Sequence, residues 1–192
     1  MKVTREQAVE NRERVLQAAS ALFRERGFGG IGVADLMKSA GMTHGAFYGQ
    51  FASKDDLMAQ ACARAMEASV QRWGAMADKG AAEGSGHDGL ARVVKSYLSE
   101  AHRDSPGKGC VLPALGSDVA REGPAVRAVV TEGTVSMIDM LTRLMPGPAD
   151  ADKRTQAIGT FASMVGAVVL SRVVDDAALS KEVLDTVVAD LL

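Results

Sequence analysis

Cys110 is the side chain of this sequence that offers the most reactive chemistry, because an ionised cysteine can act as a nucleophile or as an oxidation sensor. It follows Lys108 and Gly109 and precedes a predicted helix, with His102 a short distance upstream. A helix amino terminus and nearby cations stabilise a thiolate, so this setting predicts a lowered pKa for Cys110. The alternative is that Cys110 packs as a small buried hydrophobic residue, the commonest fate of a free cysteine.

An enzyme active site built from the same residues is disfavoured. Cys110, His102 and Asp104 could in principle serve as nucleophile, base and orienting carboxylate, but the Pro106-Gly107 segment between them gives poor preorganisation. The same segment lacks the residues of a phosphate-binding loop. The 3 histidines are far apart and the 2 cysteines have no metal-binding spacing, so we predict no metal site, no disulfide and no cofactor.

A second set of residues has the spacing of a DNA-reading motif. Apolar residues recur at helical spacing from Val33 to Ala40, and Gly41 follows as a residue suited to closing a helix. Phe47 and Phe51, four residues apart, form the buried face of a second short helix. Thr43 is expected to cap that helix through its hydroxyl group. The polar side chains left facing outward are those of Thr43, His44, Tyr48 and Gln50. Two short helices with a polar outer face on the second predict a helix-turn-helix that fits the major groove of DNA.

A family resemblance covers this region and its neighbours, about residues 9 to 70. It is carried by Gly41-Met42-Thr43-His44-Gly45-Ala46-Phe47-Tyr48-Gly49-Gln50-Phe51 and Ser53-Lys54-Asp55-Asp56-Leu57. These residues resemble the signature of TetR/AcrR-type transcriptional regulators, in particular a subgroup with Thr-His-Gly-x-Phe-Tyr in the recognition helix. The chain departs from the usual pattern at Ile31 and Gly32, where hydroxyl residues are common, and at Gln50, where histidine is common.

The resemblance implies roles for individual residues. Tyr48 and Lys54 are expected to contact DNA phosphates, whereas His44 is expected to contact a base or a phosphate. Gly45 corresponds to the position where the family lets the backbone approach DNA closely. The segment before Cys110 also resembles a branch of electrophile- and oxidant-sensing repressors that place Gly-Cys at the same helix start.

Composition agrees with a regulator that docks one end on DNA. The chain has 192 residues, 47% of them hydrophobic but only 4% aromatic, which favours helices. Its net charge is −2, yet residues 1 to 54 carry eight basic and five acidic groups. A basic head on an acidic body suits phosphate binding, although a solvated charged helix is the simpler alternative. With no signal peptide and no apolar run of about 18 residues, we expect a cytoplasmic protein without a membrane partner.

The periodic pattern predicts an all-α fold of about nine helices in two domains. Residues 1–55 are expected to form a three-helix DNA-binding domain, and residues 56–192 a helical domain for dimerisation and ligand binding. Apolar stripes on two predicted helices, at residues 126–144 and 158–172, predict a homodimer interface, although they could instead cover the core of a monomer. Trp73, Tyr97, His102 and several methionines are expected to enclose an effector pocket.

These patterns together predict a homodimeric transcriptional repressor that responds to a ligand or to redox state. Its partners would be double-stranded palindromic operator DNA and a small hydrophobic or electrophilic effector. The alternative is a helical dimeric interaction protein of the same fold that does not bind DNA.

Overall fold

The computed structural model describes residues 4–82, 86–148 and 152–192. Within these ranges the chain forms nine α-helices, two short 3₁₀ helices and no strand, which confirms the predicted all-α fold. The α-helices are α1 (Arg5–Arg26), α2 (Val33–Ser39), α3 (Lys54–Ala82), α4 (Gly86–Tyr97), α5 (Glu100–Arg103), α6 (Leu112–Val119), α7 (Pro124–Leu144), α8 (Lys153–Val173) and α9 (Ala177–Leu191). The 3₁₀ helices are η1 (His44–Ala46) and η2 (Pro106–Lys108).

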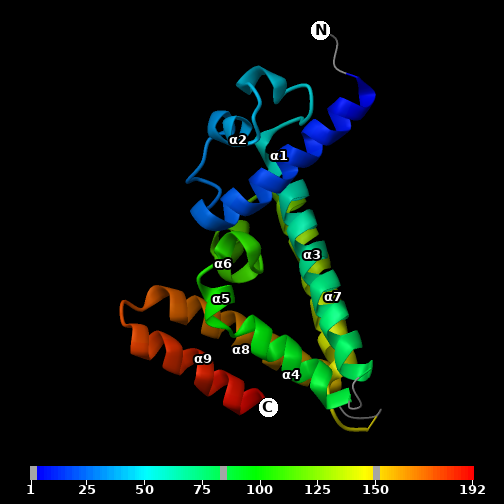
Figure 1. Cartoon of the computed structure of the whole chain (residues 1–192), viewed down its shortest axis with the longest axis vertical. Coiled ribbons are helices and arrows are strands. Elements are labelled where there is room, and N and C mark those ends of the chain that lie inside the picture. Colours follow the sequence, from blue (N-terminus) through cyan, green and yellow to red (C-terminus); the bar gives the residue numbers. More distant parts are fainter. Residues whose placement is uncertain (1–3, 83–85, 149–151) are drawn as a thin grey trace.

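The molecule has two ends joined by a pair of long helices (Figure 1). Helices α1 and α2 lie at one end together with the amino-terminal turn of α3. Helices α3 and α7 run side by side along the molecule and form the most extensive helix contact within the described residues. Helices α4, α8 and α9 form the other end, and α5 and α6 lie between the two. The boundary predicted between residues 55 and 56 falls in the first turn of α3, and the division into domains stays a prediction.

Local sequence signals explain where several helices begin and end. Thr4 and Gln7 form a capping box at the start of α1, in which each side chain accepts a hydrogen bond from the other residue's backbone N–H. Ser53 caps α3 by accepting from the Asp56 N–H at 3.0 Å. The Asp56 carboxylate accepts a hydrogen bond from the N–H of Ala52 and not from that of Ser53. Gly41 follows α2 with a φ of +73°, as predicted.

The segment after α4 forms a separate short helix. The Ser99 side chain accepts from the N–H of His102 at 3.2 Å, so Ser99 caps this helix, α5. The next helix, α6, begins at Leu112, and Pro113 lies in its first turn. Cys110 therefore lies two residues before the first residue of α6.

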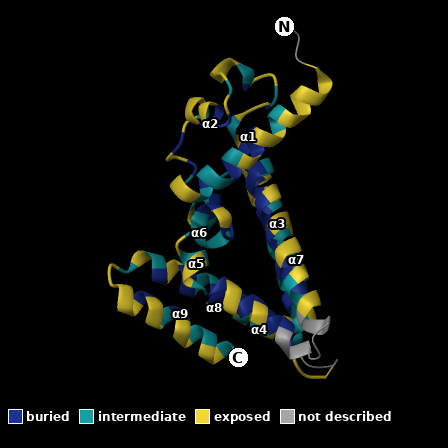
Figure 2. Ribbon diagram, in the orientation of Figure 1, coloured by how far each residue is buried: buried dark blue, intermediate teal, exposed yellow. Residues whose placement is uncertain are grey.

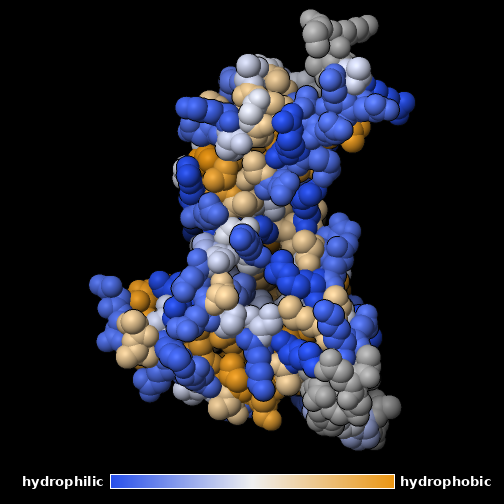
Figure 3. Space-filling view, viewed as in Figure 1, coloured by the Kyte–Doolittle hydropathy of each residue, from blue (hydrophilic) through white to orange (hydrophobic). Residues whose placement is uncertain are grey.

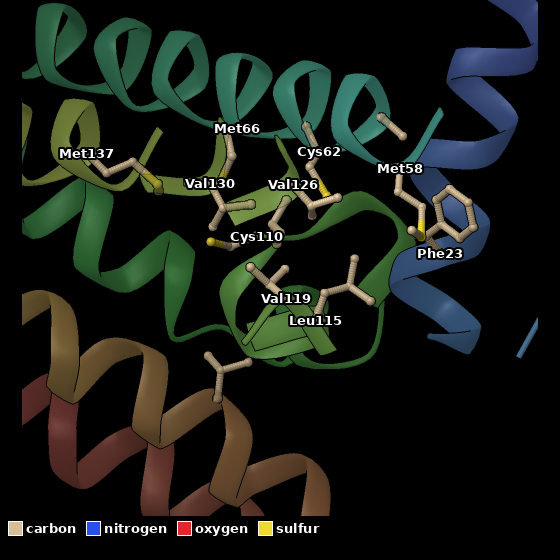
Figure 4. Packing of buried hydrophobic residues seen from close by; sticks show 14 of the residues in the cluster. Phe23, Met58, Cys62, Met66, Cys110, Leu115, Val119, Val126, Val130 and Met137 are labelled. Carbon is tan, nitrogen blue, oxygen red and sulfur yellow. The ribbon is translucent and has the colours of Figure 1, made fainter. Parts of the chain in front are cut away.

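The apolar stripe of α7 belongs to the monomer core, so assigning it to a dimer interface was wrong. Val126, Val130, Met137 and Leu141 are buried within the single chain. Figure 4 shows three of them, Val126, Val130 and Met137, facing the side chains of α3. A Cβ on Gly133 would lie 2.6 Å from the Met66 side chain, so this glycine lets the two helices approach closely. The alternative reading, in which the stripe covers a monomer core, is correct for α7.

Helix α8 is apolar on two sides. One side, with Phe161, Met164, Ala167 and Val168, is buried in the chain. The other side is exposed and carries Ile158, Val169, Leu170 and Val173. Among the described helices, α8 alone is long and apolar enough to span a membrane by length and composition, a test that a core helix of a soluble protein also passes. Figure 2 shows alternating buried and exposed residues along α8 and α9.

Candidate DNA-binding surface and effector pocket

The helix-turn-helix end presents a polar surface on a rigid aromatic base. The rings of Phe47 and Phe51 are stacked with centroids 5.6 Å apart, and both are almost completely buried. Tyr48 lies between them in sequence and is 71% exposed. Its ring meets that of Phe47 edge to face, which holds the phenol in place without burying it. The predicted inner side of Phe47 and Phe51 and the outward side chain of Tyr48 are therefore present.

The second helix of the motif is shorter than predicted. Its helical part is a single 3₁₀ turn, η1, and the Thr43 hydroxyl makes no capping hydrogen bond, so that expectation was wrong. Thr43, His44 and Gly45 are exposed. The His44 ring meets the Tyr48 ring edge to face at 6.0 Å. A Cβ added to Gly45 would meet nothing within 4 Å, so no contact inside the protein requires glycine there.

Gln50 turns toward the protein and away from the polar surface. Its amide nitrogen donates to the Ala46 carbonyl at 3.4 Å, and its side-chain oxygen is buried without a partner among the described residues. The backbone carbonyl of Gln50 accepts from the guanidinium of Arg12, which also lies 4.5 Å from the centroid of the Phe51 ring. Arg12 thus ties α1 to the end of the motif. Apart from a basic residue on α1, no sequence signal indicated this role.

Lys54 is held by two backbone carbonyls. Its ammonium group donates to the carbonyl of Phe28 at 2.6 Å and to that of Ile31 at 3.0 Å. These bonds join the amino terminus of α3 to the loop between α1 and α2. They also explain a cation at a helix amino terminus, where the helix dipole disfavours one. Contact between Lys54 and DNA phosphate remains a prediction.

A cavity of about 290 Å³ brings together the four residues predicted to bind or sense an effector, Trp73, Tyr97, His102 and Cys110. The remaining lining residues are polar or small: Ser69, Arg72, Ser96, Ser99, Ala101, Ser105, Lys108 and Gly109. Its walls come from α3, α4, α5 and the segment that contains η2. The predicted methionine walls and contributions from the two long carboxyl-terminal helices are not found among these lining residues. Ionisable and hydroxyl groups line it instead.

Cys110 lies at the boundary between this cavity and the apolar core. It is only 2% exposed, and Figure 4 places it among apolar side chains that include Val126 and Val130. Burial raises the pKa of the Cys110 thiol, although contacts with Tyr97 and with the backbone of Leu112 oppose that rise. The lowered pKa predicted from the sequence was therefore wrong, because neither a helix terminus nor a cation outweighs the loss of solvent. Burial also raises the pKa of Cys62, to about 12.

His102 connects the end of α4 to the segment before Cys110. Its Nδ1 lies 2.6 Å from the carbonyl oxygen of Tyr97, and its Nε2 lies 3.0 Å from the backbone nitrogen of Cys110. The Cys110 N–H must donate, so Nε2 is the acceptor and the proton resides on Nδ1. Burial lowers the pKa of His102, with the nearby guanidinium groups of Arg172 and Arg72 acting in the same direction. Geometry and charge both favour a neutral ring.

Arg172 is a further part of this site, which the sequence analysis had assigned to the dimer stripe. Its guanidinium donates to the carbonyls of His102 and Arg103, both at 2.9 Å, so α8 holds the carboxyl end of α5. Its third nitrogen is buried and has no partner among the described residues. The only sequence signal for this role was a cation at the end of an otherwise apolar helix.

The wall of the cavity also contacts the helix-turn-helix end. Arg24 on α1 donates to the carbonyl of Gly107 in η2. A Cβ on Gly107 would lie 2.3 Å from the carboxylate of Glu25, so η2 packs tightly against α1. Nearby, the N–H of Phe28 donates to the Asp118 carboxylate at 3.2 Å. A displacement of the 105–110 segment would therefore change direct contacts with α1.

Comparison with known proteins gives a consistent set of similarities. Residues 15–61 match the family model described as bacterial regulatory proteins, tetR family. The chain is 26% identical over 136 residues to the HTH-type transcriptional repressor NemR of Escherichia coli K12, an alignment that covers 71% of this chain and 67% of that protein. It is 35% identical over 57 residues to the HTH-type transcriptional regulator AcrR of Shigella flexneri, covering 30% of this chain and 26% of the other.

Solved structures share the fold over nearly the whole chain. The reduced form of E. coli NemR superposes with a TM-score of 0.81 at 24% identity, covering 95% of both chains. A TetR-family transcriptional regulator from Agrobacterium tumefaciens superposes with a TM-score of 0.78 at 18% identity, covering 95% of this chain and 98% of that one. At these identities the superpositions establish the arrangement of the helices alone.

Proposed function

We propose that this chain is a transcriptional regulator of the tetR family, a homodimeric repressor whose operator binding responds to a ligand or to redox state. The relatives it matches are regulators and not enzymes, in agreement with the sequence analysis. They also disfavour the alternative of a helical interaction protein that does not bind DNA. A cytoplasmic location is part of the same proposal.

One observation carries the DNA-binding part of the proposal. Thr43, His44, Gly45 and Tyr48 are exposed on one surface, directly outside the buried Phe47 and Phe51. A Cβ on Gly45 would meet nothing within 4 Å, and the ring of Tyr48 stays exposed although it contacts the rings of Phe47 and His44. We infer that Tyr48 contacts phosphate, that His44 contacts a base or a phosphate, and that Gly45 lets the backbone approach the groove. Gln50 and Lys54 are proposed to act mainly by positioning this surface, since each is bonded to the protein's own backbone.

Dimerisation is proposed to use the outer side of α8 together with α9. Ile158, Val169, Leu170 and Val173 of α8 and Leu179 of α9 are large apolar side chains left exposed in the monomer. The hydropathy surface shows hydrophobic residues gathered at this end of the molecule (Figure 3). Two copies pairing through these helices would form a four-helix bundle, which covers such a surface by symmetry. Paired recognition surfaces would then meet half-sites about 34 Å apart on the operator.

The effector part of the proposal uses the cavity beside Cys110. A ligand there, or modification of the thiol, would displace the 105–110 segment, which contacts α1 through Arg24 and Gly107. Regulation requires only that the effector bind the DNA-competent and DNA-incompetent dimers with different affinities. The structure of the relative NemR is described as a reduced form, and a redox role for Cys110 extends that description to this chain as a proposal.

The experiment that tests the proposal is a gel shift with the DNA upstream of the protein's own gene. The wild-type protein is expected to retard this DNA, whereas a Tyr48→Ala variant with an unchanged melting temperature is expected to bind weakly. Competition with an unrelated duplex at the same salt concentration separates specific from non-specific binding. If the wild type and Tyr48→Ala bind alike, the proposed DNA surface is wrong.

A further inference from the structure

The cavity beside Cys110 carries positive charge that no acid on its walls balances. Arg72 and Lys108 line it, and none of its lining residues is acidic. The nearby carboxylates of Glu100 and Asp104 are paired with Arg103. Lys108 forms no ion pair with any residue that the structure describes. An anion entering the cavity would therefore be attracted by two cations and repelled by no neighbouring lining residue.

A buried hydroxyl group in the same wall lacks a strong acceptor. Tyr97 lines the cavity and is 4% exposed, and no oxygen or nitrogen among the described residues accepts a hydrogen bond from its hydroxyl. Its one neighbour of this kind is the thiol of Cys110, and a thiol is a weak acceptor. Leaving a buried donor unsatisfied is unfavourable, so a ligand oxygen placed beside it would remove a cost that the empty protein bears.

The walls favour a small and flat molecule. The rings of Trp73 and Tyr97 meet at 77° with centroids 5.6 Å apart, and the ring of His102 lies 4.5 Å from that of Tyr97. Aromatic rings at such angles offer both faces and edges to a planar ligand. The volume of about 290 Å³ is at the lower end of the range for small-molecule sites.

We propose that this cavity binds a small planar conjugated carboxylate, with its ring against Trp73 and Tyr97 and its carboxylate toward Lys108 and Arg72. The inference rests on the proposed function, because it names the chemical class of effector for the same cavity. It narrows the hydrophobic or electrophilic effector expected from the sequence to one that carries a negative charge. The Tyr97 hydroxyl donates to a ligand oxygen.

Isothermal titration calorimetry on the full chain without DNA tests the charge preference. Benzoate, cinnamate and 2-naphthoate would each be compared with the primary amide of the same skeleton, which has nearly the same shape but no charge. At least one carboxylate is expected to bind at least about tenfold more tightly than its amide, and added NaCl should reduce that preference. Equal binding of the acid and amide forms, or no binding of any of the three carboxylates, overturns the proposal.

Substitutions at Lys108 and Tyr97 test which side chains bind the carboxylate. Lys108→Gln is expected to weaken carboxylate binding by about fivefold, whereas Lys108→Arg keeps the charge and the affinity. Lys95→Gln on α4 serves as a control, because Lys95 is exposed but does not line the cavity. Tyr97→Phe should weaken carboxylate binding without lowering the melting temperature, since the only partner of the hydroxyl that it removes is the weakly accepting thiol of Cys110. If Lys108→Gln binds carboxylates as the wild type does, the proposed orientation is wrong.

The two proposals can fail separately. Carboxylate binding is measured in the absence of DNA, so loss of operator binding by the wild type would refute the repressor function and leave the ligand class standing. If no carboxylate binds while the protein still retards its operator, the ligand class is refuted and the DNA-binding function stands.

Discussion

The backbone N–H of Cys110 donates a 3.0 Å hydrogen bond to Nε2 of His102, and this bond requires the imidazole to be unprotonated at that nitrogen. The wall of the cavity is thereby joined to the end of α4 by an imidazole ring whose pKa is lowered by burial. Protonation of His102 would place an N–H group at Nε2 directly against the backbone N–H of Cys110. The protonation state of one ring and the position of the segment that carries the cysteine are therefore linked.

The first prediction concerns stability against pH. The pKa of His102 is lowered from 6.5 in the folded protein, so the unfolded chain binds a proton more readily than the folded one. The contribution of His102 to the free energy of unfolding is thus fully present above about pH 6.5. It is lost as the pH falls through the lowered pKa of the folded state. The melting temperature should fall between pH 7.5 and pH 5 more for the wild type than for His102→Gln. His44→Gln, which changes an exposed ring, should behave as the wild type does.

The second prediction compares two glycines. A Cβ on Gly109 would lie 2.6 Å from Nε2 of His102, whereas one on Gly116 would meet nothing within 4 Å. Gly109→Ala should lower the free energy of unfolding by about 1–3 kcal/mol, the usual range for overpacking. Gly116→Ala, inside α6, should instead raise it by up to about 1 kcal/mol. Urea denaturation measures both, and equal effects of the two substitutions would contradict the close packing described here.

A third prediction addresses Gly45. Because an added Cβ has no neighbour within the protein, Gly45→Ala should change the free energy of unfolding by less than about 0.5 kcal/mol. If this backbone meets the DNA groove, the same substitution should weaken operator binding by at least about tenfold in a gel shift. Unchanged affinity would show that Gly45 lies away from the contact.

A fourth prediction separates positioning from contact at Lys54. Lys54→Ala removes the donor for the carbonyls of Phe28 and Ile31 and should lower the free energy of unfolding by about 1–3 kcal/mol. If the ammonium also contacts phosphate, the slope of log affinity against log salt should fall by roughly one unit. Tyr48→Ala should weaken binding at every salt concentration and leave that slope unchanged, because tyrosine is neutral. Tight operator binding by Lys54→Ala across salt concentrations would assign Lys54 to positioning alone.

The fifth prediction concerns the two cysteines. Cys110 lines a cavity of about 290 Å³, whereas Cys62 faces a closed space with no volume for a water-sized sphere. A quinone or hypochlorite should therefore modify Cys110 before Cys62, and the rate should rise with pH because the pKa of Cys110 is raised. Mass spectrometry would locate the adduct. Treated wild type should release operator DNA while Cys110→Ser retains it; equal release by both would leave Cys110 as a packing residue.

Sequence reasoning was most successful where local spacing decides the structure. Gly41 and the pair Phe47 and Phe51 are close in sequence, so their turn and their shared buried side follow from helical geometry. The exposure of Tyr48 followed for the same reason. Trp73, Tyr97, His102 and Cys110 line one cavity, and their role in binding or sensing an effector stays a prediction.

Sequence reasoning failed where the burial or bonding of a residue depends on a partner distant in the chain. A helical stripe such as that of α7 shows which side is apolar but not what covers it, and α3 covers it here. The pKa of Cys110 was predicted from charged neighbours in sequence, but burial by remote helices determines its direction. The carbonyl partners of Lys54 and the inward turn of Gln50 likewise come from loop geometry that no periodic pattern reveals.

Helix α3 runs without interruption for 29 residues, from Lys54 beside the DNA-binding turn past Trp73 in the wall of the cavity. At about 1.5 Å per residue, the axial distance between these two side chains is about 28 Å. A stiff rod of that length converts a tilt of about 7° at the cavity into a displacement of about 3.4 Å at its far end, which equals one base-pair step of the duplex. In a symmetric dimer, the two α3 helices would move the two recognition surfaces in opposite directions. Under the proposed function, a small molecule in the cavity would shift the register of the protein on DNA without unfolding any part of the chain.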